Sequence, residues 1–254
     1  MALKSISILD TKVSVTDLQS ASSYISECID QRKKTYVCIA PVSTVVDAQA
    51  DRAYREIINN AGMTTPDGMP LVWLGRLKGE RAIKRTYGPD LMTKFCELSQ
   101  QKSYKHYFYG GTPETNRLLV SKLSERFPRL NIVGDFAPPM RNVGEEEDAS
   151  VLEQINKADP DVMWVGLGSP KQDYWMFKHR DKLNVPVMVG VGAAFDFLAG
   201  VKKQAPRWMQ NLGLEWFFRF CCEPRRLWRR YIIGNTKFIY WIIKDFFRNS
   251  LRVK

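Results

Sequence analysis

The sequence lacks several features that would indicate common classes of protein. Its 254 residues contain no run of about 18 apolar residues, which a membrane-spanning helix needs, and its first residues lack the apolar segment of a signal peptide. It has only two histidines, and its five cysteines show no metal-binding spacing. We therefore expect a cytoplasmic protein without metal or cofactor, whose contact with any membrane is peripheral.

Acidic residues are scarce in the last part of the chain. Residues 202–254 hold 13 Lys and Arg against three Asp and Glu, whereas the preceding 201 residues hold 25 against 24. Such an excess of positive charge would suit nucleic acid or an anionic bilayer. Four interleaved tryptophans favour the bilayer and argue against nucleic acid. The alternative is an amphipathic helical subdomain that buries these aromatic residues against the core.

Apolar runs of strand length alternate with helical periodicity through residues 1–201. The candidate core strands cover residues 36–40, 63–65, 104–109, 130–133, 162–165 and 185–191. A short hairpin over residues 5–15 precedes them. This alternation predicts an α/β fold with a Rossmann-like, mostly parallel sheet and flanking helices. We divide the chain into an α/β core, residues 1–201, and a basic, aromatic-rich helical appendage, residues 202–254.

Glycine-rich turns follow three of the predicted strands. Because parallel strands point their carboxyl ends to one edge, where open α/β sheets bind ligands, these turns should lie together. Ser169 is predicted to cap a helix whose first residue is Pro170, leaving the amides of residues 168–172 to meet an anion. The amide of Gln172 suits a sugar hydroxyl or a base edge. The turn residues selected as ligand contacts are Gly110, Gly111, Thr112, Gly166, Gly168, Ser169, Pro170, Gln172, Gly192 and Asp196.

Structural explanations compete with some of these interpretations. Residues 110–112 could form a plain strand-to-helix turn, and Asp196 could bond only to backbone groups. Asp67 lies in a Pro-Asp-Gly turn after a short strand, where its ordinary role is to cap the next helix, and the residues alone favour that cap. The two histidines, His106 in an apolar strand and His179 on a predicted surface, are assigned no ligand role.

Four blocks of sequence resemble one protein family. Residues 66–68, 166–173, 190–200 and 213–231 are similar, in this order, to motifs of the WecG/TagA/CpsF family of bacterial glycosyltransferases (glycosyltransferase family 26). The resemblance implies an inverting hexosyltransferase that moves a sugar, often N-acetylmannosamine or a relative, from a UDP donor to a sugar on undecaprenyl diphosphate. Its product would enter cell-surface polysaccharide or teichoic acid.

The resemblance also implies roles for individual residues. It makes Asp67 the general base and assigns the glycine-rich turns to the UDP-sugar, with Arg85 as a partner of the donor diphosphate. A lipid-linked acceptor would explain the basic appendage, which would lie on the inner face of the cell membrane. The arginines proposed to bind the acceptor diphosphate are Arg219, Arg225, Arg226 and Arg229.

Some residues depart from the family pattern. Five residues differ from those common in the family: Cys38 and Ala40 replace a threonine and an asparagine, Pro70 a glycine, Asp173 a glutamate and Gln204 an arginine. The reaction class stands, but the identity of the sugar does not follow. The Asp-x-Asp at residues 159–161 precedes its strand rather than following it, so we expect no metal dependence. A noncatalytic UDP-sugar or lipid-binding homologue is the alternative, and the protein could form a homo-oligomer.

Overall fold

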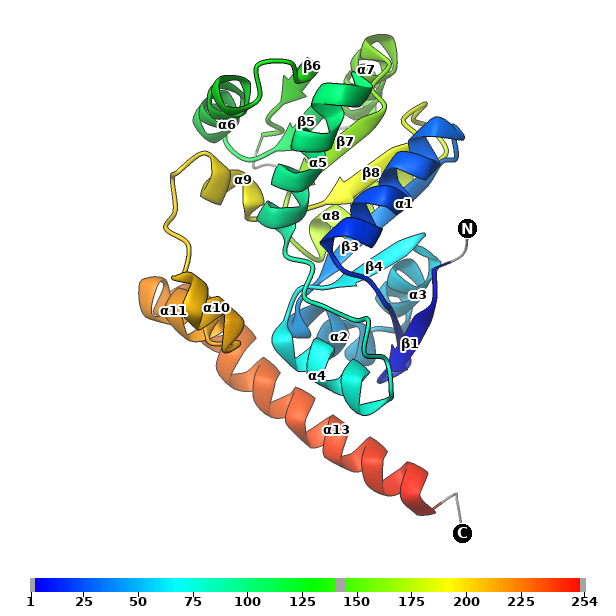
Figure 1. Ribbon diagram of the computed structural model, residues 1–254, viewed down its shortest axis with the longest axis vertical. Helices are drawn as coiled ribbons and strands as arrows, with labels where there is room; N and C mark the ends of the chain where they lie inside the picture. The colour runs from blue at the N-terminus through cyan, green and yellow to red at the C-terminus, as the bar shows by residue number, and fades with distance from the viewer. Residues whose placement is uncertain (1–2, 140–144, 252–254) are drawn as a thin grey trace.

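The computed structural model describes residues 3–139 and 145–251, which form a mixed α/β fold with a long C-terminal helix (Figure 1). At its centre is a six-stranded sheet in the order β4-β3-β8-β7-β5-β6, in which every neighbouring pair is parallel. The strands are β3 (Thr35–Ala40), β4 (Met63–Pro66), β5 (Lys105–Gly110), β6 (Asn131–Phe136), β7 (Val162–Gly166) and β8 (Val187–Gly190). The predicted Rossmann-like fold is confirmed.

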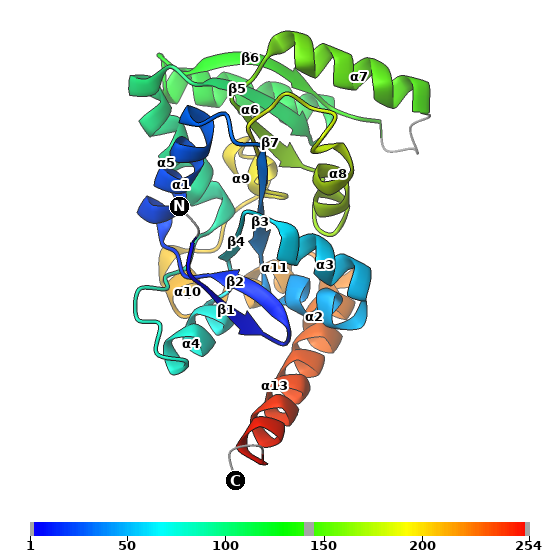
Figure 2. The same ribbon diagram turned by 90° about the vertical axis from the view of Figure 1, so that its right-hand side faces the viewer.

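The central strands are apolar because both of their faces are buried. Successive side chains point to opposite faces, so Val37 packs in one cluster while Tyr36 and Cys38 pack in the other. Figure 2 shows α1 and α5 on one side of the sheet and α3 and α8 on the other. The first face is covered by α1 (Leu18–Asp30), α5 (Gly88–Lys102), α6 (Pro113–Arg126) and α9 (Ala194–Leu198). The second face is covered by α2 (Val42–Ala50), α3 (Arg52–Asn60), α7 (Glu145–Ala158) and α8 (Lys171–His179).

A smaller apolar cluster lies beyond the β4 edge of the sheet. The predicted hairpin is present as β1 (Ser5–Ile8) and β2 (Thr11–Ser14), which pair antiparallel. Ile8 and Val13 of the hairpin pack with Leu71 of α4 (Met69–Leu77). Phe238, from the C-terminal part of the chain, is buried in the same cluster. The appendage is therefore packed onto the core through this cluster.

The C-terminal part consists of helices that run along the outside of the core. They are α10 (Arg207–Asn211), α11 (Glu215–Cys222), α12 (Pro224–Trp228), the π-helical η1 (Arg229–Ile233) and α13 (Gly234–Leu251). In Figure 1, α13 passes α2 and α4 and then extends beyond them to the C-terminus. No helix within the described residues combines the length and apolar character that crossing a bilayer requires.

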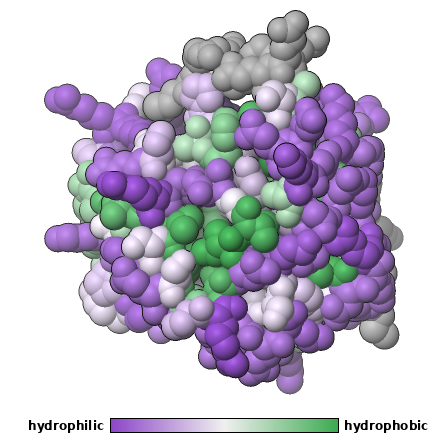
Figure 3. Space-filling view, turned by 90° about the horizontal axis from the view of Figure 1, so that it is seen from above, coloured by the Kyte–Doolittle hydropathy of each residue, from purple (hydrophilic) through white to green (hydrophobic). Residues whose placement is uncertain are grey.

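The aromatic residues of the appendage divide between the two interpretations made from sequence. Phe238 is buried, whereas Trp208, Phe246 and Phe247 are 59%, 69% and 62% exposed. At the opposite end of the molecule, which carries α6, α7 and β6, the surface is mostly hydrophilic around an apolar area (Figure 3). Because Phe246 and Phe247 follow the buried Phe238 along α13, exposed aromatic side chains continue past the part of this helix that is packed on the core.

Candidate active site

The floor of the candidate site is the carboxyl edge of β5 and β7. The chain leaves β5 toward β6 on one side and leaves β7 toward β8 on the other, so a crevice opens between these neighbours. Gly110 and Gly166 are paired across it, and a Cβ on Gly110 (φ +133°) would lie 2.6 Å from the Gly166 carbonyl carbon. A Cβ on Gly166 would in turn meet the Phe195 ring at 2.8 Å. Glycine is required at both positions because a Cβ on either residue would overlap the neighbouring strand end or the aromatic ring.

A polar pocket of about 390 Å³ opens above this floor. The turn residues selected from sequence that line it are Gly111, Gly166, Gly168, Ser169, Gln172, Gly192 and Asp196. Gly110, Thr112 and Pro170, all within the described residues, lie outside its lining. The Thr112 hydroxyl instead accepts a hydrogen bond from the Thr115 amide at 3.1 Å and so caps α6. For Thr112, the plain strand-to-helix turn is therefore the better description.

The loop before α8 differs from the prediction. The helix begins at Lys171, so Pro170 precedes its first residue, and Ser169 does not cap it. The Gly168 amide donates to Gln172 Oε1 at 3.1 Å, the Gln172 amide donates to the Gly168 carbonyl at 3.0 Å, and Gln172 Nε2 donates to the Ser169 hydroxyl at 3.3 Å. Two of the amides predicted to meet an anion are thus already bonded: the Gly168 amide to the folded-back Gln172 side chain, and the Gln172 amide to the backbone of the loop.

Asp67 does not cap the helix that follows it. The N-cap of α4 is Gly68, and no side chain among the described residues caps this helix. The Asp67 amide bonds to the Ala40 carbonyl at 3.1 Å, which fixes the turn between β4 and α4 against β3. Arg85 donates through Nε to the Asp67 carbonyl and through Nη2 to Asp67 Oδ1, the second at 3.3 Å. The carboxylate is therefore directed into the site rather than toward the helix end.

Arg85 links the core to the appendage. It lines the apolar cavity described below rather than the polar pocket, and its Nη2 also pairs with the Glu215 carboxylate of α11. Burial and the neighbouring charge of Asp67 raise the pKa of Glu215. Two carboxylates already surround Arg85, so its position supports holding Asp67 in place better than binding the donor diphosphate. Glu215 was not selected from sequence, although it lies in the Gly213–Trp216 block that carried the family resemblance.

The arginines of the appendage lie on two different helical faces. Arg219, Arg226 and Arg230 line the polar pocket, while Arg225 and Arg229, which are also described, line neither cavity. Residues four apart share a helix face, so positions 226 and 230 point to the site and positions 225 and 229 point elsewhere. Arg229 instead lies over the Trp228 ring, with its Cζ 5.3 Å from the ring centre. Arg230 was not selected from sequence.

The pocket concentrates positive charge. Partial burial and the nearby guanidinium groups of Arg219 and Arg230 lower the pKa of Arg226. Arg230 is held by a hydrogen bond from its Nε to the Ser43 hydroxyl at 2.9 Å. Lys202 lines the pocket too, and its Nζ pairs with Asp196 at 3.0 Å. Arg226 and Lys202 both pair with Glu223, which neutralises part of this charge. The remaining excess of cations at this edge suits a polyanion such as a diphosphate.

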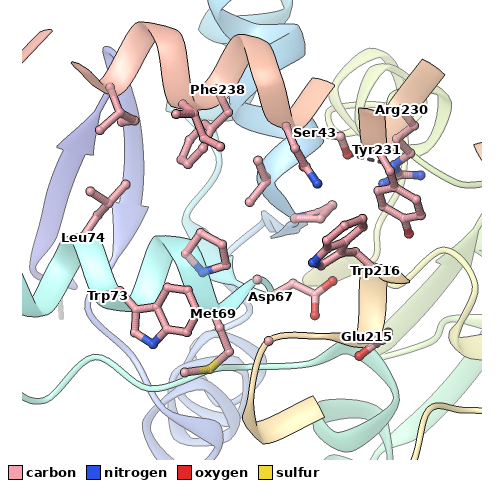
Figure 4. Close-up of a pocket in the computed structure, with 18 of the residues that line it drawn as sticks. Ser43, Asp67, Met69, Trp73, Leu74, Glu215, Trp216, Arg230, Tyr231 and Phe238 are labelled. Carbon is pink, nitrogen blue, oxygen red and sulfur yellow. Dashed lines mark hydrogen bonds between the residues drawn. The ribbon is translucent and has the colours of Figure 1, made fainter. Parts of the chain in front are cut away.

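A second, mostly apolar cavity of about 670 Å³ lies between α4 and α13. Figure 4 shows Met69 and Trp73 of α4 on one side of this cavity and Phe238 of α13 on the other. In the same view, Asp67 lies between Met69 and Glu215. The residues that line both cavities are Pro41, Asp67, Arg219 and Arg230. The apolar cavity and the polar pocket are therefore neighbours, and Asp67 lies at their border.

Comparison with known proteins identifies the family. The model of the Glycosyl transferase WecG/TagA/CpsF family matches residues 6–252. The chain belongs to this family. The resemblance inferred from the sequence motifs is thereby confirmed, and the protein is a glycosyltransferase.

Several named relatives align over most of the chain. An N-acetylglucosaminyldiphosphoundecaprenol N-acetyl-beta-D-mannosaminyltransferase of Bacillus subtilis (strain 168) is 29% identical over 240 residues, which cover 91% of each protein. A protein of the same name from Staphylococcus aureus (strain MRSA252) is 30% identical over 213 residues, covering 82% of this chain and 80% of the relative. The family match over residues 6–252 includes the appendage as well as the sheet.

Three of the departures from the family pattern fall behind the wall of the polar pocket, whereas Pro70 lines the apolar cavity. Cys38 and Ala40 are fully buried in β3 and, unlike Ile39 and Pro41, do not line the pocket within the described chain. Asp173 is also buried, where it accepts a hydrogen bond from the Tyr54 hydroxyl at 2.7 Å. Burial raises the pKa of Asp173. These substitutions change the packing that supports the pocket rather than its lining.

The histidines and the acidic pair have structural surroundings. His179 is buried at 1% exposure, so its predicted surface position is wrong; its ring packs on Trp175 with centres 4.5 Å apart. His106 is buried in the apolar strand, as predicted, and Trp164 Nε1 donates to its Nδ1 at 3.0 Å. Asp159 and Asp161 lie at the amino end of β7 and pair with basic side chains there. Within the described residues, no three His, Cys, Asp or Glu side chains gather as a metal site would require.

Proposed function

We propose that this glycosyltransferase moves an N-acetylhexosamine such as N-acetylmannosamine from a UDP-sugar to a sugar carried on undecaprenyl diphosphate, with inversion. The names of its relatives support this choice of acceptor and sugar. The observation that carries the proposal is the position of Asp67, which lines both cavities. A base between two substrate sites is what sugar transfer requires.

The polar pocket has the features of a donor site. Its glycine turns lie at the carboxyl edge of a parallel sheet, at the point where the strand order reverses, which is where such folds bind nucleotides. Arg226, which lines this pocket and not the apolar cavity, would neutralise the diphosphate of the bound UDP-sugar, while Arg219 and Arg230, at the border of the two cavities, would face both substrates. Their charge would increase in effect as the sugar–phosphate bond breaks, because negative charge then develops on the departing UDP.

Asp67 would act on the acceptor sugar. Its carboxylate takes the proton of an acceptor hydroxyl while that oxygen bonds to the anomeric carbon of the donor sugar. The bond from the anomeric carbon to the diphosphate breaks at the same time, and UDP leaves with the electron pair. Arg85 and Glu215 hold the Asp67 turn from behind, so the carboxylate keeps its direction during transfer.

The appendage would place the reaction at the inner face of the cell membrane. Basic residues and exposed aromatic side chains on α13, including Phe246 and Phe247, suit peripheral contact with anionic lipid headgroups. Since arginine cations meet the donor diphosphate, we expect transfer to proceed without a divalent metal.

The test is transfer of label from radioactive UDP-sugars into extractable lipid. The assay contains undecaprenyl-diphosphate-linked N-acetylglucosamine and is run in EDTA, with Asp67→Asn as the inactive control. We expect label in the lipid with the native enzyme and almost none with the variant. If the native protein binds UDP but transfers no sugar from any UDP donor, the enzyme proposal is wrong.

A further inference from the structure

The apolar cavity has a polar end and an apolar end. At the polar end lie Asp67, Arg219 and Arg230, which also border the donor pocket. From there the cavity runs between Trp73 of α4 and Ile239 of α13. A polar group at the inner end and a long apolar wall match an amphiphilic ligand.

The apolar end is open at the surface. Trp73 and Leu77 on one wall are 46% and 83% exposed, and Ile239 and Ile243 on the other wall are 58% and 50% exposed. Apolar side chains that face each other across a cavity and remain this exposed indicate a ligand or partner site. About one helical turn beyond Ile243, the exposed Phe247 continues the same helix away from the core. The cavity therefore opens in the direction of the part proposed to contact lipid.

We propose that the groove between α4 and α13 binds the first isoprene units of the acceptor lipid. The inference rests on the proposed function and adds a binding site for the hydrocarbon chain. The diphosphate of the acceptor would lie at Arg219 and Arg230, its sugar would reach Asp67, and its chain would leave past Leu77 and Ile243. Two observations favour this ligand: the arginines at one end of the cavity complement the charge of a diphosphate, and the cavity adjoins the proposed donor pocket.

A peptide segment fits these walls less well. An extended peptide must bond its own amide and carbonyl groups when it is buried, which the facing apolar side chains of Trp73, Leu77, Ile239 and Ile243 do not allow. An isoprenoid chain carries no such groups, so its burial is favourable along its whole length. A second copy of the chain, by contrast, would be detected in the test below as a change in oligomeric state.

Binding of soluble prenyl diphosphates tests the site without catalysis. Calorimetry below the micelle concentration would compare inorganic, dimethylallyl, geranyl and farnesyl diphosphate on the full chain. We expect affinity to rise at least about five-fold with each added isoprene unit. This is well below the increase in affinity that complete burial of five carbons would give. Equal affinity for the four probes would overturn the proposal. It would also be overturned if the ligands dissociated a dimer of the chain and that dissociation accounted for all of the measured heat.

Matched variants locate the hydrocarbon chain. Ile243→Asp should remove the dependence on chain length, whereas Phe247→Asp, the same change one turn further along α13 and outside the cavity, should leave it intact. Trp73→Ala should weaken farnesyl diphosphate about ten-fold, while Trp208→Ala, an exposed tryptophan outside both cavities, should not. The proposal fails if both members of either pair behave alike.

These outcomes separate the groove from the proposed function. If sugar transfer occurs but prenyl chain length has no effect on binding, the groove proposal is wrong and the function stands. If chain length governs binding in the native protein and not in Ile243→Asp, yet no UDP-sugar is transferred, the groove stands and the proposed function is wrong.

Discussion

The polar pocket and the apolar cavity border each other at Asp67 but are built in different ways. The floor of the polar pocket is made by strand ends and a loop whose amides are bonded internally, as at Gly168 and Gln172. The walls of the apolar cavity are side chains of two helices, and many of those side chains remain exposed. The floor of the polar pocket is therefore fixed by the backbone, whereas the shape of the apolar cavity depends on how α13 lies relative to α4.

Removing the appendage should have the largest effect, because it affects both cavities. A chain that ends at residue 206 loses Arg219, Arg226 and Arg230 from the polar pocket and Phe238 from the core cluster. We expect transfer to disappear and the affinity for UDP to fall at least about ten-fold, since several charge-assisted hydrogen bonds are lost. Calorimetry with UDP measures this effect, and circular dichroism checks that the sheet is retained. Unchanged UDP affinity would mean that these arginines serve only the acceptor.

Changing Asp67 should stop the chemistry while leaving both cavities able to bind. Asp67→Asn removes the base, which should lower the turnover rate roughly 10²- to 10⁴-fold. Binding of UDP and of farnesyl diphosphate should remain near normal, because Arg85 keeps its partner Glu215 and the fold is undisturbed. Single-turnover kinetics and calorimetry provide the two measurements. A variant that retains near-normal turnover would remove Asp67 from the mechanism.

Neighbouring arginines offer the sharpest separation of the two helical faces. Arg226→Gln should lower kcat/KM for the UDP-sugar about 10- to 100-fold, the usual value of one or two hydrogen bonds to a charged group. Arg225→Gln, one residue earlier and outside both cavities, should stay close to the native value. Steady-state kinetics on the two variants decide the matter, and equal losses would indicate general attraction to anions rather than a defined contact.

Glu215 tests the link between the appendage and the base. In Glu215→Gln, Arg85 has only the Asp67 carboxylate to neutralise it, so the carboxylate should be held more tightly and act less well as a base. We expect kcat to fall about ten-fold with little change in KM for the donor. The matched control is Asp90→Asn, which breaks the pairing with Arg207 at 2.8 Å, another bridge between core and appendage. Similar kinetics in the two variants would show that Glu215 has only a structural role.

His106 lies in the core, away from both cavities, and should affect stability alone. Burial lowers its pKa to about 3, so the folded protein keeps this ring neutral while the unfolded chain binds a proton below about pH 6.5. The contribution of His106 to the free energy of unfolding is complete above pH 6.5. As the pH falls toward 3, this free energy decreases by up to about 1.4 kcal/mol per pH unit. His106→Gln, which keeps an acceptor for the Trp164 indole, should lose less stability between pH 6.5 and 5. Urea unfolding at several pH values measures this, and transfer at neutral pH should be unchanged.

Local patterns predicted the sheet and its binding edge but not the contacts between distant segments. Strands and glycine turns could be located because burial on both faces leaves an apolar run in the sequence. The direction of the Asp67 carboxylate could not be predicted, because it depends on contacts between distant segments. Arg85, which holds it, is 18 residues away in sequence, and Glu215, the other partner of Arg85, is 130 residues from Arg85. For the same reason, neither the burial of His179 nor the core position of Phe238 follows from its neighbours in sequence.

The appendage shows a second limit of sequence patterns. Its arginines form one cluster in the sequence, and only the helix phase separates Arg226 and Arg230 from Arg225 and Arg229. That phase could have been predicted from the spacing of four residues, had the register of the helix against the core been known. A charge cluster therefore predicts a type of ligand more readily than it predicts which side chains bind it.

The order of the elements along the chain has a consequence during synthesis. Every strand of the sheet lies before residue 191, whereas the pocket arginines and the α13 wall come afterwards. On the ribosome the sheet can fold before these residues emerge. A nascent chain at that stage has Asp67 and its glycine turns but neither the arginines of the polar pocket nor the α13 wall of the apolar cavity. The two proposed substrate sites are thus completed only after the sheet, when the helices from α11 to α13 have been added.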